Sequence, residues 1–128
     1  MLMIIQKDIL GWAATIFVIF SCSYILLKRL KMHNPNFKIN LRKLLGWHCY
    51  LGIISTIIAF IHVGDNLYYI SFTAGYVSLF SMLLLSISGI ILKYVKGYKK
   101  VCRYIHIILT IIFMISLICH IMEYHFFN

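Results

Sequence analysis

The chain has 128 residues, of which 62% are hydrophobic and only 12% are charged. Globular domains carry about 25% charged residues, so this composition excludes an ordinary soluble fold. The length fits one domain, and the formal net charge of +9 would suit nucleic acid only if the basic residues were exposed along one face.

Four apolar segments are each long enough to cross a hydrocarbon layer of about 30 Å as a helix. They cover residues 9–27, 44–63, 74–92 and 101–122. Because little remains beyond these segments, we predict an all-α integral membrane protein in which residues 1–128 form a single four-helix bundle. The first residues carry no charged region ahead of the apolar run, so we expect a retained helix and not a secretory signal.

Residues 9–27 contain no charge and no histidine, and we expect a packing helix. In the following connection Pro35 lies between Asn34 and Asn36, which indicates a turn. His33 lies in this polar connection and is expected to be solvated.

The connection at residues 64–73 is short and aromatic, and Tyr68 and Tyr69 suit a membrane interface. The third segment is rich in small residues that let helices approach closely in lipid. These are Ser78, Ser81, Ser86, Ser88 and Gly89. His125 lies in the C-terminal tail and is expected to be exposed.

The charges divide the predicted helix ends into two groups. Every lysine and arginine except Lys7 falls within residues 28–43 or 93–103. The three acids, Asp8, Asp65 and Glu123, fall with Lys7 at the opposite ends. The positive-inside rule therefore predicts both termini outside and both basic connections in the cytoplasm, near anionic lipid head groups, with no nucleic-acid partner.

Four of the six histidines lie in the apolar segments, in two pairs of equal spacing: His48 and His62, and His106 and His120. Each pair is fourteen residues apart, which places both rings on one helix face, roughly 21 Å apart along the axis. The second and fourth segments run in the same direction. His48 is therefore expected opposite His106 near the cytoplasmic side, and His62 opposite His120 near the outside.

Each level then offers two imidazoles and no buried acid. A zinc site would need a tighter cluster with further ligands, whereas a porphyrin supplies four nitrogens and leaves two axial positions for histidine. The cysteines are scattered and no CxxCH motif precedes a histidine, so covalent haem attachment is not expected. The pattern predicts two haem b groups, each with iron bound by two histidines.

Other residues share the histidine faces. Gly52, Ser55 and Ala59 are small enough to admit a flat macrocycle, and Thr110 and Phe113 lie on the fourth segment. Phe113 is seven residues from both histidines of its helix, so it is expected between the two haem levels, opposite Ser55. An ordinary pairing of a large with a small side chain is the alternative.

Arg103 lies one helical turn before His106 and could pair with a propionate of the inner haem, helped by Lys43 or Arg42. Snorkelling of these cations to lipid head groups is the alternative. Lys7 is the cation nearest the outer haem.

Two stretches, residues 41–62 and 101–120, carry a family resemblance. They read LRKLLGWHCYLGIISTIIAFIH and VCRYIHIILTIIFMISLICH. The chain resembles the ferric-reductase-like transmembrane domain, the haem-bearing core of ferric reductases and NADPH oxidases. The resemblance implies that His48, His62, His106 and His120 ligate two b haems that carry electrons across the membrane.

Members of that family usually have six helices, and many continue into a cytoplasmic flavin and NADPH-binding region. Four helices are predicted here, so we expect the electron donor to be a separate flavoprotein or a quinol, and the acceptor to lie outside. Complete reductase activity is therefore not predicted for this chain.

The leading hypothesis is a diheme cytochrome b that relays single electrons across a prokaryotic plasma membrane. A haem-bearing membrane-anchor subunit of a larger quinone-linked oxidoreductase is the first alternative, and a metal permease is the second. The chain could form a homo-oligomer, and a stable homo-oligomer that works without another subunit would count against the membrane-anchor alternative.

Overall fold

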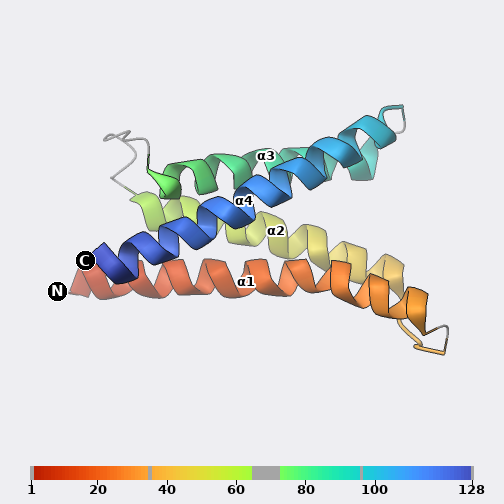
Figure 1. Cartoon of the computed structure of the whole chain (residues 1–128), viewed down its shortest axis with the longest axis horizontal. Helices are drawn as coiled ribbons and strands as arrows, with labels where there is room; N and C mark the ends of the chain where they lie inside the picture. Colours follow the sequence, from red (N-terminus) through yellow and green to blue (C-terminus); the bar gives the residue numbers. More distant parts are fainter. Residues whose placement is uncertain (1, 35, 65–72, 96, 128) are drawn as a thin grey trace. The chain divides into compact units, whose positions relative to one another are not determined.

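A computed structural model describes residues 2–34, 36–64, 73–95 and 97–127, with the side chains of 2–8 and 124–127 left out. Four α-helices make up almost all of this part of the chain (Figure 1). They are α1 (Leu2–His33), α2 (Leu41–Val63), α3 (Ala74–Tyr94) and α4 (Lys99–Phe127). The predicted all-α class is confirmed, and each helix contains a stretch long and apolar enough to cross a membrane.

The helices extend beyond the apolar segments that predicted them. α1 continues past residue 27 through the basic residues up to His33, and α4 already begins at Lys99. Hydropathy marks only the apolar part of a helix, while lysine and arginine are good helix formers whose long stems reach toward polar surroundings. The basic connection between α1 and α2 is therefore shorter than the charge pattern suggested, and His33 is exposed at the end of α1.

The chain reverses direction between His33 and Leu41, as predicted, although Pro35 lies outside the described residues. The amide of Phe37 donates to the carbonyl of Asn34 at 3.0 Å. At the start of α2, the Asn40 side-chain oxygen accepts from the amides of Arg42 and Lys43 at 3.1 and 3.2 Å. Asn40 thus caps the helix that carries the first histidine pair.

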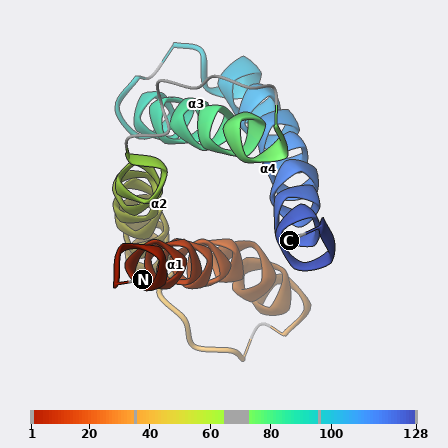
Figure 2. The ribbon, with the colours of Figure 1, turned by 90° about the vertical axis from the view of Figure 1, so that its left-hand side faces the viewer.

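The helices form two units, each of which is a hairpin: α1 with α2 in Met1–Val63, and α3 with α4 in Gly64–Asn128. Within each unit the two helices lie side by side and antiparallel in both views of the ribbon (Figure 2).

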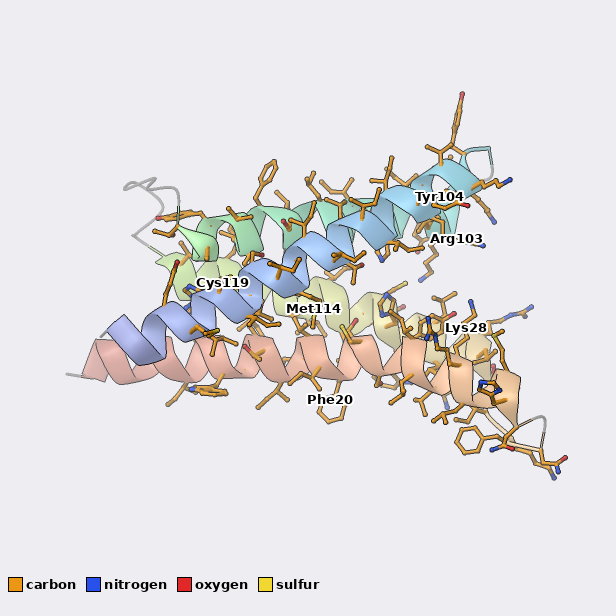
Figure 3. The ribbon with its side chains drawn as sticks, viewed as in Figure 1. Phe20, Lys28, Arg103, Tyr104, Met114 and Cys119 are labelled. Atoms are coloured by element: carbon orange, nitrogen blue, oxygen red, sulfur yellow. The ribbon has the colours of Figure 1, made fainter. Side chains whose placement is uncertain are left out.

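Small side chains make up much of the buried helix faces, together with a few larger apolar ones. On α1 the buried residues are Ala14, Val18 and Ser21, which follow helical spacing. On α3 they are Ser78, Leu79, Ser81, Met82 and Ser88, so the predicted packing role of the α3 serines is confirmed for three of them. Large apolar side chains lie on the outside, and Phe20 points away from α2 (Figure 3). This inversion of size suits a lipid surrounding.

Replacing the cap of α2 tests how that helix is started. We expect Asn40→Ala to cost about 1 kcal/mol of stability, because two backbone amides lose their acceptor. Hydrogen exchange at Arg42 and Lys43 should accelerate in the variant. Asn36→Ala, an exposed change in the same connection, is the control, and equal exchange in both variants would contradict the capping role.

Candidate functional site

In each hairpin the two histidines lie on one helix and contact the other helix. His48 and His62 of α2 contact α1, and His106 and His120 of α4 contact α3. The two helices to which the sequence analysis gave a packing role therefore contact all four rings.

His48 is held by three contacts from α1. Its Nδ1 lies 2.9 Å from the Ser21 hydroxyl oxygen and 2.8 Å from the Ser21 carbonyl oxygen. The Tyr24 ring lies against the imidazole, with 5.4 Å between the ring centroids. A carbonyl oxygen can only accept a hydrogen bond, so Nδ1 of His48 must carry the proton. The Ser21 hydroxyl donates its own proton to the His48 carbonyl at 3.1 Å. Its oxygen therefore accepts from Nδ1 of the imidazole.

His106 is held by α3 in an equivalent way. Its Nδ1 lies 2.7 Å from the Ser88 hydroxyl oxygen. That hydroxyl also lies 2.9 Å from the Leu85 carbonyl oxygen, which can only accept. When the single hydroxyl proton goes to Leu85, Nδ1 of His106 is the donor to Ser88. The Cys102 thiol donates to the Ser88 carbonyl at 3.7 Å. Ser88 thus joins α3 to α4 at two points.

The ring of His48 is consequently fixed in one tautomer, and the contact of His106 with Ser88 accommodates the same one. With the proton on Nδ1, a neutral imidazole carries its lone pair on Nε2. Metal-ligating histidines almost always donate their other ring N–H to a protein acceptor, which fixes the tautomer and orients the ring. His48 meets this condition through Ser21, and Ser88 offers His106 an oxygen at Nδ1 that can accept in the same way. Both residues therefore fit an axial ligand of haem iron.

His62 and His120 rest on glycines. A methyl group added at Gly11 would lie 3.0 Å from Cε1 of His62. A methyl group added at Gly75 would lie 2.9 Å from both Cε1 and Nδ1 of His120. Carbon atoms do not approach so closely, so each ring occupies the space that a side chain on α1 or α3 would need.

The midpoint residues of the histidine helices are buried. Ser55 is 0% exposed and Phe113 is 4% exposed. Gly52 lies beside Ser21, since an added methyl group there would be 3.9 Å from the serine hydroxyl. Gly52 therefore lies at the contact between α1 and α2, where its carbonyl accepts from Ser55 at 3.0 Å and from Thr56 at 2.8 Å.

The remaining predicted residues lie close to the histidines along their own helices. Thr110 donates to the His106 carbonyl at 2.7 Å, and Ala59 is half-buried. Arg42 and Lys43 are exposed in the first turn of α2, and Arg103 is exposed near the start of α4 (Figure 3).

The predicted pairing of His48 with His106, and of His62 with His120, joins residues of different hairpins and stays a prediction. The same holds for Phe113 opposite Ser55. The side chains of Lys7, Asp8 and His125, and the segment with Asp65, Tyr68 and Tyr69, lie outside the described residues. Within the described part of the chain, no three His, Cys, Asp or Glu side chains gather as a metal cluster.

The residues that the sequence reasoning missed are Gly11, Ser21, Gly75 and Ser88. Ser88 was assigned to packing alone, and Gly11 and Ser21 lay in a helix taken to be plain. A usable signal did exist: an antiparallel hairpin brings the start of one helix to the end of the next, where a small residue has to face each ring.

Comparison with known proteins adds no family assignment. No protein-family model, curated protein or solved structure matches the chain.

Two glycines of α3 allow a matched test of this packing. We expect Gly75→Ala to displace the His120 ring and to destabilise the protein by about 1–3 kcal/mol, the usual cost of overpacking. Gly89→Ala should be neutral or stabilising by up to about 1 kcal/mol, because its methyl group would lie 3.7 Å from His106, an ordinary contact, and alanine favours helix. Unfolding free energies in detergent measure both, and equal effects would contradict the close contact at Gly75.

Proposed function

We propose that the chain is a diheme b-type cytochrome of the plasma membrane of a prokaryote, built on the plan of the ferric-reductase-like transmembrane core. His48 and His106 would be the axial ligands of one haem, called here the inner haem. His62 and His120 would be those of the other, the outer haem. Bound haem iron would supply one-electron redox chemistry.

The observation that carries this proposal is the contact between Nδ1 and a serine hydroxyl that His48 and His106 share. A histidine buried only for packing has no reason to present an Nε2 lone pair, and either nitrogen could carry the proton. Here two histidines at equivalent places on two helices place Nδ1 within hydrogen-bond distance of a serine hydroxyl of the preceding helix, and for His48 the Ser21 carbonyl makes Nδ1 the donor. The repetition favours the same role for Nε2 in both residues, that of a ligand atom.

The spacing within each helix supports two separate levels. The equal interval of fourteen residues in α2 and α4 places the rings of each pair roughly 21 Å apart along the axis. Ionisable side chains in membrane-spanning helices are costly and usually functional. Four such histidines in two matched pairs fit a transmembrane electron path.

The remaining residues would influence how electrons enter and leave the two haems. Arg103, Lys43 and Arg42 can bind an inner haem propionate or anionic lipid with their exposed cationic groups. With two imidazoles on each iron, electrons would enter and leave at the haem edges. The donor would be a cytoplasmic-side flavoprotein or quinol, and the acceptor would lie outside.

A haem count tests the proposal. Protein purified after expression with haem supply should give a b-type reduced-minus-oxidised spectrum and two haems per chain by pyridine haemochrome assay. His48→Ala, His106→Ala and the double variant should each retain the outer haem alone, whereas the exposed His33→Ala should retain both. Wild-type protein free of haem would refute the function, and loss of one shared haem in His48→Ala and His120→Ala would refute the pairing.

The orientation can be measured separately by labelling single cysteines, placed in a chain without its native cysteines, in intact cells. We expect Lys38→Cys, in the basic connection, to be protected from a membrane-impermeant maleimide, because lysine-rich connections stay in the cytoplasm. Thr73→Cys, at the start of α3, should react. The reverse pattern would place the basic connections outside.

A further inference from the structure

We propose that Ser21 and Ser88 are positioning residues for the inner haem, each holding the imidazole that would ligate its iron. This inference rests on the proposed function and extends it to α1 and α3. Within each hairpin, the helix that carries the histidine would then be complemented by a residue of its neighbouring helix that orients the ring.

The first argument is the proton balance at each serine. The Ser21 hydroxyl donates to the His48 carbonyl, and the Ser88 hydroxyl donates to the Leu85 carbonyl. With that proton used, each oxygen offers only lone pairs to the nearby ring. An imidazole that binds iron through Nε2 carries its proton on Nδ1, so both serines would accept from it, a role that alanine or glycine could not fill.

The second argument is the contrast with other serines of the same helices and hairpins. Ser23 donates to the Phe20 carbonyl and Ser116 donates to the Phe113 carbonyl, each within its own helix. That is the ordinary behaviour of a serine in a membrane-spanning helix. Ser21 and Ser88 make such a carbonyl bond and also reach a histidine of the neighbouring helix.

The third argument is electronic. An imidazole that donates from Nδ1 becomes a more basic ligand at Nε2. A more basic ligand stabilises ferric iron relative to ferrous iron, so it lowers the reduction potential of its haem. Loss of the serine oxygen should therefore raise the reduction potential of the inner haem. The potential of the outer haem, at His62 and His120, should stay unchanged.

Redox titration of the full chain tests this with Ser21→Ala and Ser88→Ala. We expect each variant to keep two haems and to raise one and the same midpoint, by about threefold to tenfold in the reduction equilibrium, or about 30 to 60 mV for a one-electron couple. In Ser21→Ala the carbonyl of residue 21 remains as an acceptor for His48, so we expect this variant to give the smaller of the two shifts.

Ser23→Ala and Ser116→Ala are the matched controls, and both midpoints should stay at their wild-type values. Ser88→Thr, which keeps the hydroxyl, should restore the midpoint that Ser88→Ala shifts. Two unchanged midpoints in the alanine variants, or equal shifts of both, would overturn the positioning role. Wild-type protein without haem would instead refute the proposed function, so the two failures are distinguishable.

Histidine side-chain 15N NMR of the reduced protein gives a readout that does not depend on the potential. Ser88→Ala should perturb the Nδ1–H signal of His106 and leave that of His120 unchanged. If an alanine variant folds too poorly for titration, the midpoint of Ser88→Thr and this spectrum still test the positioning role. An unperturbed His106 signal would overturn the inference.

Discussion

The structure depends on how a ring nitrogen is satisfied where water is scarce. An imidazole inside a membrane-spanning helix needs a protein acceptor for its N–H, because an unpaired polar group in hydrocarbon costs several kcal/mol. Ser21 and Ser88 meet this need for His48 and His106. These bonds lie where α1 meets α2 and where α3 meets α4, among the small residues that let the helices approach closely.

The two hairpins solve the same problem with different spacing. From Gly11 to Ser21 is ten residues, and from Gly75 to Ser88 is thirteen, against fourteen between the histidines they face. These intervals correspond to about 15, 20 and 21 Å of helix. α3 thus follows α4 almost residue for residue, while α1 meets α2 over a shorter interval. What the two hairpins repeat is the contact of each histidine with a small residue of the neighbouring helix. Because the spacing of those small residues differs, the sequence shows only a weak two-fold repetition.

Hydropathy and histidine spacing were sufficient to predict four apolar helices, the turn near Pro35 and the four histidines as the distinctive residues. They could not predict the helix ends, since charged residues continue α1 to His33. They could not predict Gly11, Ser21 or Gly75 either. The importance of a small residue depends on what faces it across the hairpin, and a single sequence gives the interval within each helix but not the register between two of them.

Serine satisfies two demands at these positions that are usually met by different residues. Close approach of helices in lipid favours glycine, alanine or serine, whereas a ring N–H needs an acceptor. A serine whose own proton goes to a backbone carbonyl is small and presents only lone pairs. A free hydroxyl could instead donate to Nδ1 and leave the proton on Nε2, the tautomer that cannot ligate a metal through Nε2. The carbonyl bonds of Ser21 and Ser88 therefore matter as much as their contacts with the histidines.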